Sequence, residues 1–374
     1  MKITIGGDLV LSESYEISRI DKSISNIFQT SDLNILNLEA PITHSNNKIN
    51  KTGPHIKADL KSTEEVLNLL NVNFITLANN HIKDYNDQGI KDTLEFCESN
   101  SISTIGAGMN IESASEIKYL ATEIGMISVL NFTENEWSIA SEASSGANPL
   151  DLINNSRDIK IAKENSDFLI LIIHGGNEHY KYPSPRMVKQ YRYYAELGAN
   201  LIVGHHTHCL SGYELFGKTP IFYSLGNFLF TMRRKNPESW YTGLILNLEI
   251  NNSKDVSFSL LPIRQSQQDF SLKLLEENEK QNVLLEISKI NKIIEDKRLL
   301  DDTWSHFVEK NHSAFIRNIS PVGGISNKYL RALFYRSHLY KLFLNDSYVK
   351  EFLNRIRCEA HYDLTKEIFS KMLK

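Results

Sequence analysis

Short runs of apolar residues recur along the first 265 residues, and segments with helical spacing separate them. Apolar runs of this kind are typical of strands that are covered on both faces of a sheet. Two later runs alternate more strictly and predict a closing hairpin around residues 251–253. The predicted strands are residues 2–5, 33–38, 74–77, 104–105, 124–131, 168–173, 201–203, 221–224, 244–250 and 256–261.

Three segments between these runs predict helices. Residues 62–70 open with Ser-Thr-Glu-Glu, a capping pattern that predicts a helix start at Ser62. Residues 88–100 and 184–197 place their apolar side chains at helical spacing. Because strands and helices alternate, we expect an α/β layered domain over residues 1–264.

The pattern changes near residue 264. Residues 265–374 carry little strand signal, and residues 276–297, 327–344 and 349–373 have helical amphipathic spacing. The segment Pro-Val-Gly-Gly-Ile-Ser from Pro321 interrupts this pattern. We therefore expect an all-helical C-terminal domain over residues 265–374, with an excess of Lys and Arg from residue 327 onward.

Composition narrows the classes of function. The 374 residues include 41 Lys and Arg against 45 Asp and Glu, which gives no support to a nucleic-acid-binding surface. The cysteines Cys97, Cys209 and Cys358 form no Cys-x-x-Cys pair, so we expect neither a disulfide scaffold nor a zinc ribbon. The first residues show no signal peptide, and no apolar run has the length of a membrane span. These features predict a cytoplasmic protein.

Side chains that can bind metals follow five of the predicted strands. Open α/β sheets bind their ligands at these strand ends, where loops from several strands meet. Each case alone has an ordinary explanation as a turn or a buried histidine, but their recurrence predicts a metal site. The side chains are Asp8, Glu39, the run Asn79-Asn80-His81, His174, and the run His205-His206-Thr207-His208.

The mixture of imidazole, carboxylate and amide ligands indicates the kind of metal. It suits Mn, Fe or Zn. Six candidate ligands exceed what one tetrahedral ion needs, whereas two ions roughly 3.5–4 Å apart with a bridging carboxylate would use them all. Such a pair lowers the pKa of a bridging water, and the resulting hydroxide can attack a phosphorus atom in line.

Six motifs in order resemble those of the CapA family, the bacterial capsule or poly-γ-glutamate synthesis proteins also called PGA-cap. The resemblance covers about residues 1–264. Departures are Gly175 where the family commonly has Trp, His179 where Tyr is common, and a missing N-terminal membrane anchor. The motifs are Gly7-Asp8, Asn37-Leu-Glu39, Leu77-Ala-Asn-Asn-His81 with Asp84-Tyr85, His174-Gly-Gly-Asn-Glu178, Gly204-His-His-Thr-His208 and Tyr223-Ser-Leu-Gly-Asn-Phe228.

The resemblance implies a calcineurin-like metallophosphatase fold, a β-sandwich flanked by helices, with two divalent transition-metal ions. It implies Glu39 as the bridging carboxylate and His81 as the general acid, with Asp84 of the same motif also assigned to catalysis. His205 is an alternative to His206, although the His-x-His spacing favours His206. The implied metal ligands are Asp8, Glu39, Asn80, His174, His206 and His208.

Five further residues are expected near this centre or its substrate. Glu178 is a candidate for orienting His174, and Arg186 is a candidate for binding phosphate. A solvated helix face is the alternative for Arg186. The residues expected beside the ligands or the substrate are Asn79, Glu178, Arg186, His205 and Asn227.

We therefore expect a phosphomonoesterase or phosphodiesterase linked to capsule, exopolysaccharide or poly-γ-glutamate production. Its substrate would be a phosphorylated or polyanionic small molecule or polymer. The alternative is a non-hydrolytic accessory or binding subunit of a polymer synthase that uses the metal structurally. In a third hypothesis the C-terminal helices dock onto a synthase or a membrane surface; a lid or a dimer interface is the alternative for them.

Overall fold

A computed structural model describes residues 1–233, 236–251, 255–319 and 321–357, together with residues 361, 365, 368–369 and 372. The chain divides into two compact units, Met1–Leu300 and Asp301–Lys374. The turn predicted at residues 251–253, the end of the helix predicted at 349–373, and Cys358 fall wholly or partly outside the described residues.

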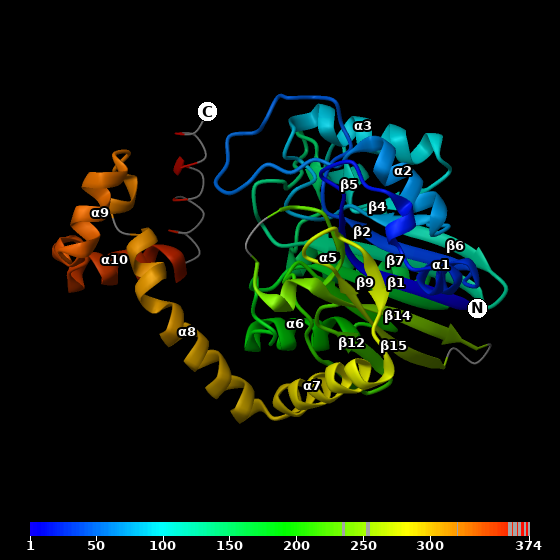
Figure 1. Cartoon of the computed structure of the whole chain (residues 1–374). Coiled ribbons are helices and arrows are strands. Elements are labelled where there is room, and N and C mark those ends of the chain that lie inside the picture. Colours follow the sequence, from blue (N-terminus) through cyan, green and yellow to red (C-terminus); the bar gives the residue numbers. More distant parts are fainter. Residues whose placement is uncertain are drawn as a thin grey trace. The chain divides into compact units, whose positions relative to one another are not determined.

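The first of two large sheets combines parallel and antiparallel strands (Figure 1). Its order is β16-β15-β14-β1-β2-β3-β4, and β13 also pairs with β1. Strands β1 to β4 run parallel, whereas β14 to β16 are antiparallel. The strands are β1 (Lys2–Val10), β2 (Leu33–Leu38), β3 (Phe74–Thr76), β4 (Ser103–Ile105), β13 (Asn227–Phe230), β14 (Thr242–Ile250), β15 (Val256–Gln265) and β16 (Leu272–Leu274).

The second large sheet has the order β11-β12-β10-β9-β7-β6. Its central strands β12, β10, β9 and β7 are parallel, and antiparallel partners form both edges. A small two-stranded sheet pairs β5 with β8. The strands are β6 (Lys118–Thr122), β7 (Gly125–Thr133), β9 (Phe168–His174), β10 (Leu201–His205), β11 (Tyr213–Phe216), β12 (Thr219–Phe222), β5 (Ala107–Gly108) and β8 (Gly146–Ala147).

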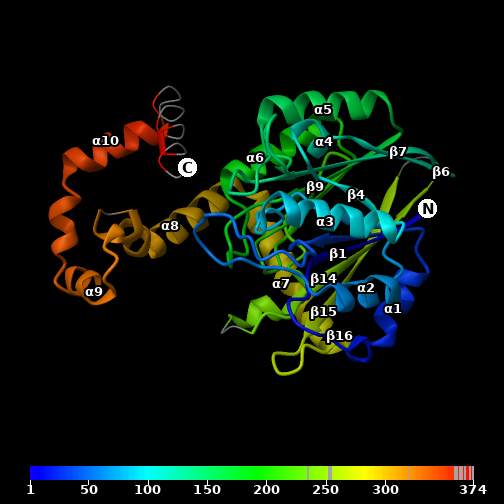
Figure 2. The same ribbon diagram turned by 90° about the horizontal axis from the view of Figure 1, so that it is seen from above.

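The two sheets pack face to face, and helices cover their outer faces (Figure 2). In β9, Ile170 and Ile172 join the core between the sheets, whereas Leu169 and Leu171 join the core under the helices. This alternation explains why the strand is apolar throughout, because both of its faces are buried. The sandwich flanked by helices is the fold that the sequence predicted.

The helices divide between the two outer faces. Helices α1 (Lys22–Gln29), α2 (Leu60–Leu69) and α3 (Asn86–Ser99) share a core with the first sheet. Helices α5 (Leu152–Glu164) and α6 (Pro185–Glu196) share a core with the second sheet. The short helix α4 spans Ile111–Ala114.

Some local expectations need correction. Helix α2 begins two residues before Ser62, and its cap is Asp59, whose side chain accepts a hydrogen bond from the backbone of Ser62. Ser184 caps α6 with Pro185 in its first turn, in agreement with the predicted start. The sequence analysis did not predict α1, α5, β6, β11, β13 or β16 as separate elements.

The expected boundary at residue 264 lies inside the first compact unit. Strand β16 pairs with β15 and extends the first sheet beyond that residue. Helix α7 (Glu277–Glu295) then buries Ile287 in the core between the sheets, and Ile290 and Ile294 in the core of the second sheet. This packing keeps α7 in the first unit although it follows the predicted boundary.

The described part of the chain from residue 297 onward is helical, whereas β16 shows that the expected all-helical region does not begin at residue 265. This helical part contains α8 (Lys297–Ile319), α9 (Lys328–Arg336), α10 (Asp346–Arg357) and the 3-10 helices η3 (Pro321–Gly324) and η4 (Leu339–Phe343). Helix α8 begins just before the limit of the second unit. Among the described helices, none combines the length and apolar content that crossing a lipid bilayer requires.

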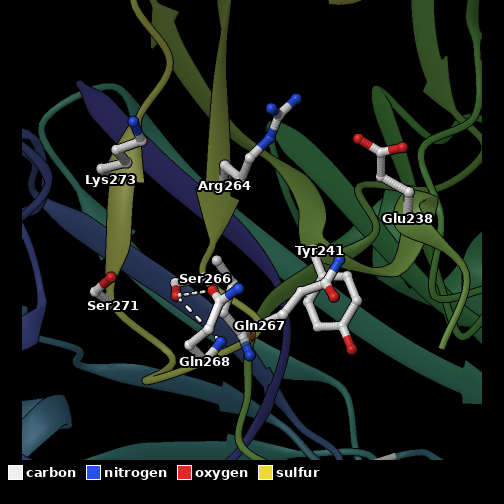
Figure 3. Close-up of a pocket in the computed structure, with 9 residues that line it drawn as sticks. Glu238, Tyr241, Arg264, Ser266, Gln267, Gln268, Ser271 and Lys273 are labelled. Atoms are coloured by element: carbon white, nitrogen blue, oxygen red, sulfur yellow. Dashed lines mark hydrogen bonds between the residues drawn. The ribbon is translucent and has the colours of Figure 1, made fainter. Parts of the chain in front are cut away.

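A surface pocket lies where β15 and β16 meet the 3-10 helix η2 (Glu238–Tyr241), as Figure 3 shows. Arg264 and Lys273 are register partners on the two strands and line this pocket with several Ser and Gln side chains. Arg264 pairs with Glu279 at 3.0 Å. The pocket contains none of the predicted site residues.

The core between the sheets is expected to dominate stability. Ile172 is completely buried there, so Ile172→Ala should lower the free energy of unfolding by about 2–5 kcal/mol. Ile153→Ala on the exposed face of α5 is the control, with a change within about 0.5 kcal/mol. Urea denaturation measures both variants, and equal effects would contradict the assignment of this core.

Candidate metal centre

The predicted metal ligands meet where parallel strands of both sheets end. Asp8 lies in β1, and Glu39 directly follows β2. His174 is the last residue of β9, and the run from His206 to His208 follows β10. Parallel strands of one sheet end at a common edge, so each sheet presents its own set of ligands there.

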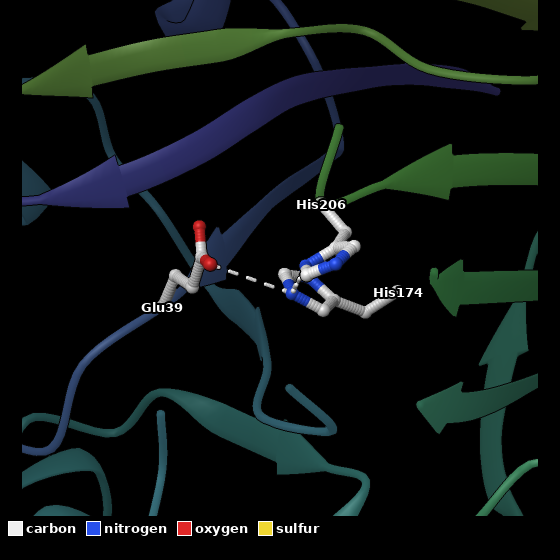
Figure 4. A group of neighbouring side chains, drawn as sticks. All are labelled: Glu39, His174 and His206. Carbon is white, nitrogen blue, oxygen red and sulfur yellow. Dashed lines mark hydrogen bonds and ion pairs between the residues drawn. The ribbon is translucent and has the colours of Figure 1, made fainter. Parts of the chain in front are cut away.

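One group of side chains centres on His174 Nε2. This atom lies 3.0 Å from Asn80 Oδ1, 3.0 Å from His206 Nδ1 and 3.4 Å from Glu39 Oε1. Glu39, His174 and His206 point toward one another in Figure 4, and each offers an atom within 4.8 Å of the others. The group therefore offers three side chains suited to one divalent ion, with the Asn80 oxygen beside them.

A second group contains Asp8, Glu39 and His208. His208 Nε2 lies 3.7 Å from Glu39 Oε1, and its Nδ1 lies 3.7 Å from Asp8 Oδ2. His208 Nδ1 also donates a hydrogen bond of 2.9 Å to Asn227 Oδ1, which leaves Nε2 as the nitrogen free to bind a metal. Glu39 belongs to both groups, as a bridging carboxylate would.

The surroundings of the Glu39 carboxyl group show whether these side chains suit a bound cation. The residue is completely buried, and neither carboxylate oxygen has a hydrogen-bond partner. Burial raises the pKa of this carboxyl well above its ordinary value, and the nearby carboxylates of Asp8 and Glu178 raise it further. Since a buried carboxylate without hydrogen bonds is costly unless a cation offsets it, the surroundings of Glu39 fit a metal.

The histidine rings are in the protonation state that metal binding requires. Burial lowers the pKa of His174 well below its ordinary value, and the neighbouring His206 ring lowers it further. Burial, followed by the charge of His208, lowers the pKa of His206 to about 4. Burial also lowers the pKa of His208. These shifts favour neutral imidazole rings, in which one nitrogen keeps a lone pair for a metal.

The pKa of Asp8 moves in the direction that a metal ligand needs. Burial raises this pKa. The contact with His205, together with the nearby His174 and His208 rings, lowers the pKa by more than burial raises it. The pKa therefore lies below its ordinary value, and Asp8 remains a carboxylate at neutral pH.

The turn after β10 holds its histidines in unusual backbone conformations. His206 has φ of 89° and His208 has φ of 53°, the left-handed region that residues other than glycine rarely adopt. Thr207, which lies between these two histidines in the sequence, donates a hydrogen bond of 2.8 Å from its Oγ1 to Ser224 Oγ. Backbone strain of this kind persists where the surrounding structure enforces it, and it often marks functional sites.

A close approach of two backbones places Asn227 beside His208. A Cβ atom at Gly7 would overlap the carbonyl oxygen of Gly226. Glycine at position 7 therefore allows β1 and the segment before β13 to meet, and Asp8 pairs with Asn227 in the strand register.

Asn37 is a residue of this centre that the sequence analysis assigned no role. Its amide nitrogen donates a hydrogen bond of 2.7 Å to Asp8 Oδ1 and lies 3.1 Å from His174 Nδ1. It therefore contacts one residue from each of the two groups. The available signal was an asparagine in a mostly apolar strand, and Asn34 in the same strand gives the same signal.

Other expected residues lie at different distances from the groups. His205 is buried, and its Nδ1 lies 3.4 Å from Asp8 Oδ1, but it belongs to neither group. Asn79 accepts a hydrogen bond from the backbone of His81. Arg186 pairs with Glu134 at 3.4 Å on an exposed helix face.

His81 is held by a buried carboxylate. Its Nδ1 donates a hydrogen bond of 2.7 Å to Asp84 Oδ2, which also accepts one of 2.7 Å from the backbone of Ile56. The Lys51 ammonium forms an ion pair with the other Asp84 oxygen. Asp84 therefore fixes the orientation of His81 and leaves its Nε2 for chemistry.

A cleft of about 250 Å³ adjoins these groups. His81, Asn80 and His208 line it together with Glu178, so the cleft reaches both the metal ligands and the His81 ring. The arrangement offers a binding space next to two groups of possible metal ligands and a positioned imidazole. Such an arrangement can hold, polarise and protonate an anionic substrate.

Comparison with known proteins identifies the family. Residues 2–232 match the family model described as bacterial capsule synthesis protein PGA_cap. The chain belongs to this family. The CapA family that the motifs predicted is thereby confirmed.

Individual relatives match parts of the chain. The PGA biosynthesis protein CapA of Bacillus subtilis (strain 168) is 34% identical over 225 residues, 59% of each chain. The capsule biosynthesis protein CapA of Bacillus anthracis is 29% identical over 247 residues, 62% of this chain and 60% of that one. The chain thus matches about three fifths of the length of these curated relatives.

A phosphatase from Mycoplasma pneumoniae is among the similar solved structures. The alignment covers 72% of this chain and 95% of that one, with a TM-score of 0.45 and 16% sequence identity.

The contacts of Asn37 generate a prediction. Asn37→Ala removes an amide that donates to Asp8 and contacts His174, so the affinity for Mn²⁺ or Zn²⁺ should fall about 10–100-fold. Calorimetric titration of metal-free protein measures this change. Asn68→Ala, on the exposed side of α2, is the matched control. Unchanged affinity in Asn37→Ala would show that this contact does not support the ligands.

Proposed function

We propose that this protein is a phosphoester hydrolase that uses two divalent transition-metal ions, Mn, Fe or Zn. The surroundings of the Glu39 carboxylate carry this proposal. The carboxylate is completely buried, accepts no hydrogen bond, and lies between two groups of metal-binding side chains. A bridging role between two cations accounts for all three properties.

The two ions would have different ligand sets. Glu39, Asn80, His174 and His206 would hold one ion, and Asp8, Glu39 and His208 would hold the other. When bound, such ions lower the pKa of a water molecule to supply a nucleophile and neutralise charge on a phosphoryl group. Asn37 and Asn227 would keep the ligands oriented.

His81 would donate the proton to the leaving oxygen. Its Nδ1–H is committed to Asp84, so Nε2 is the nitrogen that would face the reacting group. Asp84 would hold the ring in place, and Lys51 and the backbone of Ile56 hold Asp84. The Asp84 and Lys51 charges would therefore serve orientation rather than contact with the phosphorus atom.

The biological setting we propose is capsule, exopolysaccharide or poly-γ-glutamate production. Membership of the capsule-synthesis family and the names of its two Bacillus relatives support this setting. A cytoplasmic location and a synthase partner for the C-terminal helices remain predictions from the sequence.

Metal content tests the bridging role of Glu39. Protein purified without chelator and without a histidine tag should contain about two transition-metal equivalents per chain by elemental analysis. Glu39→Gln removes the shared charge with little change in volume and should leave less than one equivalent. Glu164→Gln, exposed on α5, should retain the wild-type content. Full occupancy in Glu39→Gln would contradict the bridge.

The proton-donor role of His81 can be separated from metal binding. His81→Ala should lower kcat for an alkyl phosphate by about 10²–10⁴-fold, but lower it less for p-nitrophenyl phosphate, whose leaving group needs no proton. The metal content should stay at the wild-type level, and exposed His44→Ala should retain full activity.

Two results would contradict these roles. Loss of metal in His81→Ala would make His81 a ligand rather than an acid. Metal-loaded wild-type protein that turns over no phosphoester would favour the accessory-subunit hypothesis instead.

A further inference from the structure

The cleft beside the metal ligands has an aromatic wall. Trp240 lies in η2, and its ring centroid is 4.4 Å from that of His208 and 4.9 Å from that of Phe230. His179 lies on the same wall, 5.6 Å from Trp240 by ring centroids. A substrate group seated against Trp240 would therefore lie directly next to a proposed metal ligand.

Two buried donors at this wall have no acceptor. Trp240 Nε1 and Asn236 Nδ2 are buried atoms without a hydrogen-bond partner, and both residues line the cleft. Trp240 is only 4% exposed. Buried donors are nearly always paired, because an unpaired one costs about 1–3 kcal/mol. A ligand that supplies acceptors to the cleft would pair them.

The cleft also presents carboxylates. Glu136 and Glu178 line it, and Glu136 interacts with the Asn80 side chain. Lys51, which also lines the cleft, is paired with Asp84. These two carboxylates offer acceptors to the hydroxyl groups of a ligand.

We infer that this cleft binds the uncharged, hydroxyl-rich part of a sugar phosphate, which makes a phosphorylated carbohydrate the substrate class. This inference rests on the proposed hydrolase function. Sugar hydroxyls donate to Glu136 and Glu178 and accept from Trp240 Nε1 and Asn236 Nδ2. The apolar face of the sugar ring packs against the aromatic wall.

The donors distinguish this ligand from a positively charged one. An aromatic wall with carboxylates also suits a quaternary ammonium group such as that of phosphocholine. Such a group has no acceptor for Trp240 Nε1 or Asn236 Nδ2, so both donors would remain unpaired. A carbohydrate satisfies the donors and the carboxylates together.

Steady-state kinetics on metal-loaded full-length protein tests the substrate class. The panel consists of the 1-phosphates of glucose, galactose, mannose and N-acetylglucosamine, with phosphocholine and phenyl phosphate. At least one sugar phosphate should exceed phosphocholine in kcat/KM by tenfold or more. A preference for phosphocholine, or equal rates for sugar phosphates and phosphocholine, would overturn the inference.

Two variants connect this preference to the donors. Trp240→Phe keeps an aromatic ring but removes Nε1–H, and Asn236→Ala removes the amide. Each should lower the ratio of kcat/KM for the preferred sugar phosphate to that for phenyl phosphate roughly tenfold. Trp304→Phe in α8 is the matched control. Equal losses on both esters in the two variants, with unchanged urea unfolding, would contradict a sugar-binding role.

Binding without turnover separates this inference from the proposed function. Saturation-transfer NMR with metal-free protein and the methyl glycosides of the same four sugars reports on the sugar subsite alone. Glycoside binding that weakens in both variants, in a protein that hydrolyses no phosphoester, would support the subsite and reject the hydrolase. Hydrolysis without sugar preference and without glycoside binding would support the hydrolase and reject the subsite.

Discussion

The structure depends on a carboxylate that the protein alone does not satisfy. Glu39 is completely buried, its oxygens accept no hydrogen bond, and the His174 and His208 rings lie 3.4 and 3.7 Å from its Oε1 atom. Burying such a charge costs several kcal/mol unless a cation offsets it. Several unusual features nevertheless bring the ligands together around Glu39. His206 and His208 adopt left-handed backbone conformations, and Gly7 allows β1 to approach the backbone of Gly226. A cation bound at Glu39 would account for this arrangement of side chains.

The apolar runs predicted an α/β layered domain, and the resemblance to the CapA family added the two-layer sandwich flanked by helices. Strands buried on both faces are mostly apolar, and β2 was predicted with its observed limits although it contains Asn34 and Asn37. Edge elements such as β6 and β11 are half exposed, so their mixed patterns gave no clear signal. The start of α2 was misplaced because Asp59 caps it from outside the Ser-Thr-Glu-Glu pattern.

The position of the candidate site could be predicted for a similar reason. Parallel strands end at a common edge, so polar residues that follow several strands must gather, as Glu39 and His174 do. Sequence order could not show what lines the cleft beyond them. Trp240 comes from a 3-10 helix far along the chain, and Glu136 from a loop without motif character. Trp240 and Glu136 line the same cleft because of how the two sheets pack, and a local sequence pattern does not predict that packing.

The division of the ligands between the sheets has a mechanical consequence. Asp8, Glu39 and Asn80 lie in or just after strands of the first sheet, whereas His174, His206 and His208 lie in or just after strands of the second. Ions bound by both sets would cross-link the two halves of the sandwich at one edge. Sliding of one sheet over the other would then require coordination bonds to break. Metal binding would thus resist shear between the layers and add to the folding free energy of the whole unit.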